Sequence, residues 1–339
     1  MNLLFTCAGR RNYLLKYFKT ALKGQGKIVA VDSHLSAPAL AEADISIKVP
    51  NIFDTGYIDA LISIIKENNI GALISLNDLE LPLLAKHKEV LEQAGARLLV
   101  SDEKFVDISF DKWKTYHFFK NAGILTPQTF LSIEDTLKAI KNHTLNYPLI
   151  LKPRWGSASI GIEVVENEAE LLLFHQALKI KLTKSILKHK GLEDADNSIV
   201  IQKKIEADEY GMDILNDFDG NHYKSFVRKK LSLRSGETDR AISVINDDFL
   251  AIGERIGNAT RHIGNMDCDF FVKGNEIYFL EMNPRFGGGY PFSHEAGIDT
   301  PSIYLSWLNG ESDLSKFDNY KSDLAFSKFD TLISTKAIE

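Results

Sequence analysis

The segment YFLEMNPRFGGGYP, residues 278–291, combines residue types that can bind a metal ion and an anion. Side chains alternate between the two faces of an extended strand, so Glu281, Asn283 and Arg285 should project to one face and Met282 to the other. Carboxylate and carboxamide oxygens suit Mg²⁺, which often keeps water and substrate phosphates as its other ligands. Arg285 could hold an anion beside such a metal. The alternative is a solvated strand end followed by a glycine turn.

The segment KPRWGSASIGI offers a turn that could bind phosphate. Lys152 ends a predicted strand, and the small residues that follow it are Gly156, Ser157, Ser159 and Gly161. Small residues let backbone N–H groups approach a phosphate closely. The segment lacks the spacing and the following helix of a P-loop. It therefore predicts a hairpin between two strands, and such turns also occur without a ligand.

The segment IVIQKKIEADEYGMDIL could contact a nucleoside. Gln202 stands at a predicted strand end, and Glu209 follows seven residues later at the start of the next strand. Backbone amides after a strand end can pair with an adenine edge, and a carboxylate can accept hydrogen bonds from ribose hydroxyls. An ordinary surface carboxylate is the alternative for Glu209.

About one hundred N-terminal residues alternate strand-type and helix-type segments, which predicts a parallel sheet with helices on its faces. Ligands of such sheets bind at the carboxyl ends of the strands. The polar residues expected at these ends are Gly9 with Arg10 and Arg11, then Asp32, then Asn77, Asp78 and Glu80. The arginines could instead be surface residues at a helix start, and the two acids could simply favour a helix N-terminus through its dipole.

Composition bounds the class of protein. A chain of 339 residues with 44% hydrophobic and 25% charged residues is typical of a soluble protein with about two or three domains. The net charge of −6 with interspersed signs gives no general attraction to nucleic acid or to membranes. Cys7 and Cys268 have no metal-ligand spacing, and neither a signal peptide nor a long apolar run is present. We therefore expect a cytoplasmic protein in a reducing compartment.

The order of these motifs resembles the ATP-grasp superfamily, and most closely its carbamoyl-phosphate-synthase-like branch. The resemblance runs from CAGRR through ISLNDLELP and DKWKTYHFFKNAGILTP to LEMNPR, which is nearly the whole chain. It implies an α/β and α+β fold, in which a Rossmann-like parallel-sheet domain (1–108) precedes a two-part ATP-grasp domain. The parts would be a small lid subdomain (109–196) and a large subdomain with the metal site (197–339).

The resemblance also implies a nucleotide site. Lys112 and Lys152 would contact the ATP phosphates beneath the loop from Gly156 to Gly161, which includes Ser157 and Ser159. Gln202 and the backbone from Lys203 to Ile205 would line the adenine, and Glu209 would bind the ribose. Lys203 and Lys204 replace an acid and an aromatic residue that are frequent in the family, and this blurs the adenine pocket.

The metal and catalytic residues follow from the same resemblance. Asp269 and Glu281 would bridge Mg²⁺, or Mn²⁺ in its place, to the phosphates, and Asn283 would complete a second ion. Asp267 lies two residues from Asp269 on the same strand face, so either aspartate could be the first ligand. The catalytic residues would be Arg285, Lys152 and Arg240. The substrate candidates are Arg10, Asp78, Glu80 and His294, although for His294 we favour the alternative of a histidine packed beside the glycine turn.

The implied activity is that of an ATP- and Mg²⁺-dependent carboxylate–amine ligase that releases ADP and phosphate. ATP would convert a carboxylate into an acyl phosphate, which an amine or a related nucleophile then attacks. The alternatives are activation of bicarbonate through carboxyphosphate and a regulatory protein that binds nucleotide without turnover. The expected partners are small-molecule substrates, with neither nucleic acid nor membrane, and the chain could form a homodimer.

Overall fold

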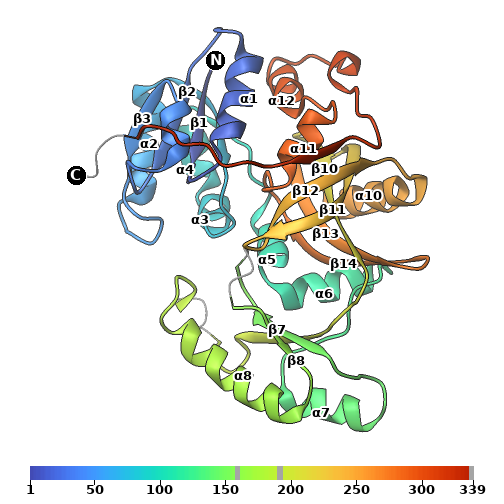
Figure 1. The fold of residues 1–339 in the computed structure, drawn as a ribbon. Helices are drawn as coiled ribbons and strands as arrows, with labels where there is room; N and C mark the ends of the chain where they lie inside the picture. The colour runs from blue at the N-terminus through green and yellow to red at the C-terminus, as the bar shows by residue number, and fades with distance from the viewer. Residues whose placement is uncertain (157–160, 189–193, 336–339) are drawn as a thin grey trace.

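Three β-sheets organise the protein (Figure 1). The computed structural model describes residues 1–156, 161–188 and 194–335. The N-terminal domain carries the first sheet, a small subdomain projects below it in Figure 1, and the large subdomain holds the third and longest sheet. No helix in these described ranges is long and apolar enough to cross a membrane.

The first sheet has five parallel strands in the order β3-β2-β1-β4-β5. Its strands are β1 (Asn2–Thr6), β2 (Ile28–Asp32), β3 (Ile45–Lys48), β4 (Ile70–Ser75) and β5 (Arg97–Leu98). The helices around it are α1 (Asn12–Leu22), η1 (Pro38–Glu42), α2 (Tyr57–Glu67), α3 (Leu81–Lys86) and α4 (Lys88–Gln93). The parallel sheet confirms the predicted fold class for this domain. Two consecutive strands, β2 and β3, interrupt the predicted alternation, and two short helices, α3 and α4, meet at His87 after β4.

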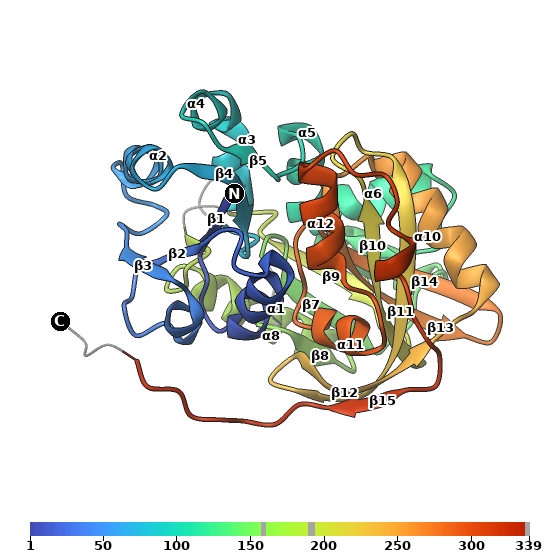
Figure 2. The same cartoon turned by 90° about the horizontal axis from the view of Figure 1, so that it is seen from above.

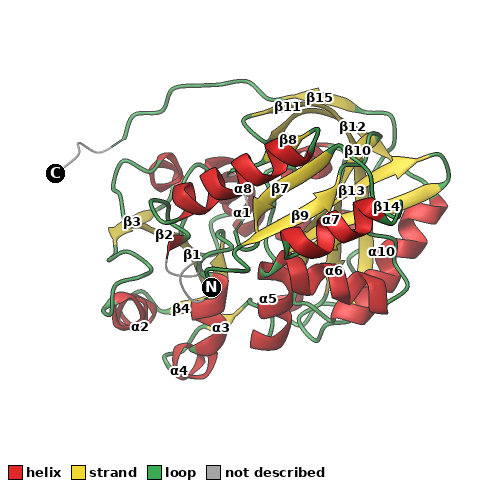
Figure 3. Cartoon of the chain, turned by 90° about the horizontal axis from the view of Figure 1, so that it is seen from below, coloured by secondary structure: helices red, strands yellow, loops and turns green. Residues whose placement is uncertain are grey.

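The second sheet has four strands in the order β6-β9-β7-β8 and forms the small subdomain. Its elements are β6 (Thr129–Phe130), α7 (Ile133–Lys141), β7 (Leu149–Pro153), β8 (Glu163–Val165), α8 (Glu168–Leu182) and β9 (Ile199–Lys203). Both helices lie against this sheet (Figure 3), and their apolar side chains share one core with it. Strands β7 and β8 form the predicted antiparallel hairpin. Because β9 pairs with both β6 and β7, the small sheet extends past the boundary expected at residue 196, to Lys203.

The third sheet has six strands in the order β14-β13-β10-β11-β12-β15, all antiparallel to their neighbours. They are β10 (Asp208–Asn216), β11 (His222–Arg234), β12 (Glu237–Val244), β13 (Gly264–Lys273), β14 (Glu276–Asn283) and β15 (Ala325–Ser327). The associated helices are α5 (Glu103–Phe110), α6 (Lys112–Asn121), α10 (Asp247–Thr260), α11 (Tyr290–Glu295), α12 (Thr300–Leu308) and the short η2 (Ser315–Phe317). Helices α5, α6 and α10 share a core with β10, β13 and β14, so the apolar side chains of residues 103–121 pack on the large sheet, while the start of α6 also contacts the end of β7. We therefore propose that the small subdomain comprises about residues 129–203.

A single apolar core joins the N-terminal domain to the large subdomain. Helix α1 presents Phe18, whose ring lies 5.0 Å from that of Phe5, 5.8 Å from Phe286 and 5.9 Å from Tyr304. Phe5 belongs to β1, whereas Phe286 lies in the turn after β14 and Tyr304 lies in α12. After β15 the chain turns back and runs alongside the N-terminal domain (Figure 2). The two large units are therefore fixed relative to each other by buried aromatic contacts.

Removing the Phe18 ring tests this joint core. We expect Phe18→Ala to lower the free energy of unfolding by about 3–5 kcal/mol, because the substitution leaves a cavity between the two units. Urea unfolding followed by circular dichroism would measure the change. Leu173→Ala, at a side chain that is 64% exposed, is the control and should shift stability by less than about 0.5 kcal/mol. A loss for Phe18→Ala no larger than that of the control would contradict a continuous core.

Candidate functional site

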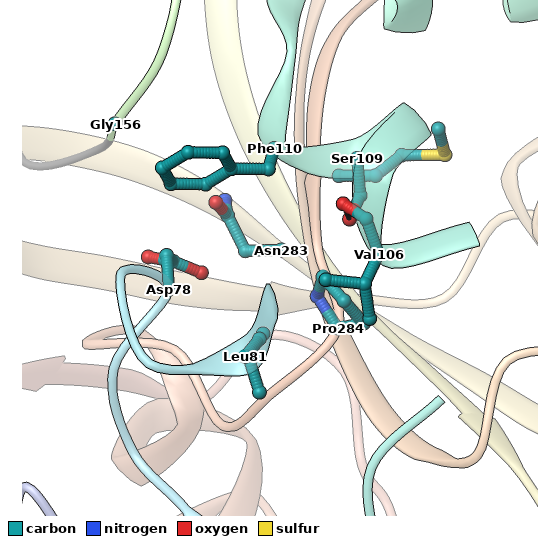
Figure 4. Close-up of a pocket in the computed structure, with 9 residues that line it drawn as sticks. Asp78, Leu81, Val106, Ser109, Phe110, Gly156, Asn283 and Pro284 are labelled. Atoms are coloured by element: carbon teal, nitrogen blue, oxygen red, sulfur yellow. Dashed lines mark hydrogen bonds between the residues drawn. The ribbon is translucent and has the colours of Figure 1, made fainter. Parts of the chain in front are cut away.

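The three units meet at one small pocket (Figure 4). Asp78 reaches it from the loop after β4, Gly156 from the loop after β7, and Asn283 from the end of β14. In Figure 4 Asp78, Asn283 and Phe110 point toward the same space, with Gly156 on its far side. The other lining residues are Leu81, Val106, Ser109, Met282 and Pro284. Segments that are far apart in sequence thus converge at this pocket, and three of the candidate residues, Asp78, Gly156 and Asn283, line it.

Strands β13 and β14 place their acidic and amide side chains side by side. Asp269 stands directly opposite Glu281 in the antiparallel register, and Asp267 stands opposite Asn283. Asn283 Nδ2 lies 3.4 Å from Glu281 Oε1, whereas the intervening Met282 is buried in the core. The strand alternation expected from the sequence is therefore present. The resulting oxygen donors, two carboxylates and an amide, are of the kind that suits Mg²⁺ when phosphates supply further ligands.

The two aspartates of β13 have different partners. Asp267 accepts a hydrogen bond from Arg228 Nη2 at 2.5 Å and lies 3.7 Å from Arg285 Nη1. Asp269 is paired at 2.6 Å with Lys230 Nζ. Because Asp267 is held between two buried arginines, the geometry favours Asp269 as the metal ligand of the pair. In the described parts of the chain no cluster of three or more His, Cys, Asp or Glu side chains has a metal-binding arrangement.

Two lysines face these carboxylates from the opposite side. Lys152 stands in β7 and Lys112 begins α6, where its ammonium donates a hydrogen bond to the carbonyl of Gly156. Burial lowers the pKa of Lys152 to about 8, with the field of Glu281 opposing the shift and that of Lys112 adding to it. Burial also lowers the pKa of Lys112, although Glu281, Asp78 and Asp111 counteract it. Two neighbouring cations in a buried site should attract a polyanion such as a chain of phosphates.

Asp111 explains why Lys112 lies beside Arg154 and Gly156 at the end of β7. Its carboxylate caps α6 by accepting from Trp113 N at 2.9 Å, and it also accepts from Arg154 Nε at 2.9 Å and Arg154 Nη2 at 2.8 Å. The amide of Lys112 donates to the carbonyl of Arg154 at 2.9 Å. A buried bidentate pair of this kind has strong directional preference. It therefore fixes the start of α6 against the end of β7.

Arg285 connects the end of β14, which carries Glu281 and Asn283, to the N-terminal domain. Its Nη2 donates to Asp78 Oδ2 at 2.5 Å, and both side chains are more than nine-tenths buried. Burial alone would lower the pKa of Arg285, but Asp78, Asp267 and Glu281 raise it above its ordinary value. The Nε of Arg285 is buried without a hydrogen-bond partner in the described structure. An unsatisfied buried donor beside a metal-type donor set fits the binding of an anion.

Arg228 is a buried cation that the sequence reading missed. It donates to Asp213 Oδ2 and Asp267 Oδ1, each at 2.5 Å, and its side chain is 1% exposed. A Cβ at Gly289 would lie 2.1 Å from the Arg228 guanidinium, and one at Gly211 would lie 2.8 Å from it. The glycines of RFGGGYP thus leave space for this ion pair. The sequence showed only a polar run, RKK, that is typical of a solvated strand.

The residues expected to bind the nucleoside lie in β9 and at the start of β10. Gln202 is buried and donates from Nε2 to Thr129 Oγ1 at 2.9 Å, and the amide of Lys203 donates to the Gln128 carbonyl at 2.9 Å. Ile205 is also buried. Glu209 pairs with Lys230 at 2.7 Å, and burial raises the Glu209 pKa. The Lys203 amide is therefore already engaged within the small sheet, so an adenine contact would fall to other backbone atoms of this segment.

The remaining candidates lie apart from this cluster. Arg10 is exposed, and Arg240 is exposed with its Nε donating to Ser232 Oγ at 3.0 Å. Glu80 is fully buried inside the N-terminal domain, where it accepts hydrogen bonds from Thr6, Ser75 and Tyr57. His294 stacks on Tyr17 at 3.7 Å between α11 and α1, as its packing alternative predicted. Ser157 and Ser159 lie outside the described residues, whereas Gly156 and Gly161 adopt positive φ angles of 90° and 69°.

Removing the charge of Arg228 tests the buried ion cluster that it forms with Asp213 and Asp267. We expect Arg228→Met to lower the free energy of unfolding by about 3–5 kcal/mol, because two buried carboxylates lose their cation. Thermal and urea unfolding would measure the loss, and adding Asp213→Asn should recover part of it. Arg234→Met is the matched control, since its ion pair with Asp330 is solvent-exposed and its removal should change stability little. Equal losses for Arg228→Met and the control would contradict a structural role for the buried pair.

Family comparisons agree with this geometry. Residues 3–99 match the family described as PylC-like, N-terminal domain, and residues 109–289 match the ATP-grasp domain. The carbamoyl phosphate synthase large chain of Gemmatimonas aurantiaca is 22% identical over 308 residues, which cover 86% of this chain and 26% of that relative. The chain thus spans about a quarter of the length of the curated relatives it matches.

Solved structures share the fold. The biotin carboxylase domain dimer of the Hydrogenobacter thermophilus 2-oxoglutarate carboxylase, in complex with MgADP, ADP and bicarbonate, has a TM-score of 0.74 at 19% identity and covers 96% of this chain and 73% of its own. An L-amino acid ligase from Bacillus licheniformis has a TM-score of 0.68 at 19% identity, with 96% and 78% covered. At these identities the likeness establishes the fold, which confirms the predicted architecture. The match to the ATP-grasp domain covers more than half of this chain, so the chain belongs to the ATP-grasp family.

Proposed function

We propose that this protein is an ATP- and Mg²⁺-dependent ligase that activates a carboxylate as an acyl phosphate for attack by an amine or a related nucleophile. One observation carries the proposal. Lys112 and Lys152 face the adjacent carboxylates of Asp269 and Glu281, and Arg285 completes the cluster. This set can hold a triphosphate and neutralise charge during its transfer, and it contains no side chain that needs to act as a nucleophile.

The proposed roles follow from where the side chains lie. Lys112 and Lys152 bind the phosphates beneath the loop that follows β7, and Gln202 and the backbone near Ile205 line the base. Glu209 accepts from the ribose, while Asp269, Glu281 and Asn283 hold Mg²⁺. The metal, when bound, supplies positive charge that offsets the charge on the β- and γ-phosphates. These contacts position ATP and exclude water.

The reaction then needs two displacements. A substrate carboxylate oxygen attacks the γ-phosphorus, and the bond to the ADP oxygen breaks. The amine next attacks the acyl carbon, loses a proton and expels phosphate. Arg285 follows β14, close to Glu281, and its Nε, like that of Arg228, is buried without a hydrogen-bond partner in the described structure, so it is well placed to stabilise the phosphoryl group as charge moves outward.

Bicarbonate activation is the second candidate. It is favoured by the names of two similar proteins, a carbamoyl phosphate synthase large chain and a biotin carboxylase domain described with bicarbonate. The likeness to an L-amino acid ligase instead supports a carboxylate–amine ligase. A homodimer remains part of the proposal, since the biotin carboxylase neighbour is described as a dimer. The complete set of lysines, acids and arginine speaks against a protein that binds nucleotide without turnover.

Trapping the activated carboxylate tests the proposal. With ATP, Mg²⁺ and hydroxylamine, the protein should release ADP and form a hydroxamate from at least one member of a panel of amino acids and sugar acids, because hydroxylamine attacks acyl phosphates. Glu281→Gln should reduce ADP release by a factor on the order of 10² or more, since it removes a charged metal ligand. Colorimetric hydroxamate detection and a coupled ADP assay give the readouts.

The same assay separates the candidates. ADP release that depends strictly on bicarbonate and gives no hydroxamate would replace the ligase with bicarbonate activation. Nucleotide binding without ADP release under any substrate would overturn both. Arg234→Met, which alters an exposed ion pair, is the variant expected to keep the wild-type rate.

Lys152 should make nucleotide binding depend on pH. Its pKa of about 8 means that the free protein carries the charge below that pH and loses it above. Bound phosphates favour the charged form, so binding above pH 8 must take up a proton, and affinity should fall by up to about tenfold per pH unit. Calorimetry with a non-hydrolysable ATP analogue, in buffers of different ionisation enthalpy, measures both effects. Lys152→Met should lose most of the proton uptake; an unchanged uptake in this variant would assign the effect to another group.

A further inference from the structure

Lys230 lies between two carboxylates that the proposed function assigns to different ligands. It belongs to β11, and its side chain is only 7% exposed. Its Nζ lies 2.7 Å from Glu209 Oε1, the proposed ribose acceptor, and 2.6 Å from Asp269 Oδ1, the proposed metal ligand. Strands β13, β10 and β11 are consecutive in the sheet, so the ammonium of Lys230 on β11 links Glu209 of β10 to Asp269 of β13. Nothing in the phosphate or metal chemistry described above uses this lysine.

An ammonium in contact with Asp269 opposes a divalent cation at the same carboxylate. Two positive charges that share one carboxylate are only a few ångströms apart, and repulsion at that distance is strong in a partly buried site. Other cations already surround the same acids: Lys152 acts on Asp269 and Glu281, and Arg228 also acts on Asp269. Without nucleotide, the carboxylates are therefore neutralised by protein side chains and gain little from a metal ion.

Bound nucleotide reverses this balance. The phosphates bring negative charge next to Lys152 and the metal position, which offsets the excess of cations. This added negative charge favours a divalent cation at Asp269 only after the nucleotide has bound.

We propose that Lys230 is a positioning residue that makes metal binding depend on nucleotide binding. It holds Asp269 and Glu209 in place before either ligand arrives, and its charge keeps the divalent cation from binding alone. This inference rests on the proposed function. Lys230 lowers the affinity of the nucleotide-free protein for the metal ion. Because metal and nucleotide binding are coupled, the nucleotide then strengthens metal binding by a correspondingly larger factor.

Mn²⁺ binding to the full chain tests the inference without any measurement of turnover. Free Mn²⁺ is followed by electron paramagnetic resonance, with and without a non-hydrolysable ATP analogue. In the wild type, Mn²⁺ alone should bind weakly and the analogue should strengthen its binding to the protein. Lys230→Met should bind Mn²⁺ alone about tenfold more tightly or better, and the strengthening by the analogue should shrink by the same factor.

The neighbouring residue supplies the matched control. Lys229 lies on β11 like Lys230 but pairs with Asp208 of β10 at 2.6 Å. Asp208 belongs to neither proposed ligand site, so Lys229→Met should behave as the wild type. Lys230→Arg keeps the charge and should retain weak binding of Mn²⁺ alone. Lys230→Gln serves as a second neutral variant if Lys230→Met does not fold, which circular dichroism would reveal.

The outcomes separate this inference from the proposed function. If the neutral variants at Lys230 bind Mn²⁺ alone no more tightly than Lys229→Met, while the analogue still strengthens binding, the coupling role is overturned and the metal–nucleotide site stands. If the analogue strengthens Mn²⁺ binding neither in the wild type nor in any variant, the proposed function fails and the inference fails with it.

Discussion

The buried ion pair between Arg285 and Asp78 is the contact on which the geometry of the site depends. It joins the end of β14 to the loop after β4, so β14 and the N-terminal domain are held together at this point. A charge removed from water needs its partner, because an unpaired buried ion carries a large desolvation penalty. Arg285 also lies close to Asp267, which Arg228 holds from behind. The N-terminal domain is thus tied to the acids of β13 through a continuous series of charges.

The small subdomain is attached by a second, separate pair. Asp111 binds Arg154 at the start of α6 and leaves the loop after β7 within reach of Lys112. Since the pocket is lined by all three units, its shape depends on both pairs at once. The apolar core around Phe18 fixes only two of these units. The position of the small subdomain depends on the Asp111–Arg154 ion pair and also on an apolar contact, since Leu79 of the N-terminal domain packs against the small-subdomain core.

Local patterns predicted a large part of this arrangement. Alternating strands and helices predicted the parallel sheet, and strand periodicity predicted that Glu281 and Asn283 share a face while Met282 is buried. Pairing between distant strands was harder to foresee. The assignment of β9 to the small sheet and the burial of Arg228 and Lys230 depend on register across strands, which periodicity does not specify. Strand β3 was missed because ISIK is short and only partly buried. Arg10 and Glu80 follow the ends of β1 and β4 as expected, but which way each side chain points was set by packing.

The glycines around Arg228 have a consequence for how the sequence can vary. Gly211 and Gly289 each stand where a Cβ would collide with the guanidinium, and Gly287 stands where a Cβ would lie 2.1 Å from Asp267. None of the three has a positive φ, so their backbone conformations alone do not demand glycine. A side chain at any one of them becomes tolerable only after the arginine or its aspartate partner has become smaller. Divergence at these positions is therefore epistatic: the order in which substitutions occur decides which of them survive, and the ion pair must be exchanged before the glycines are.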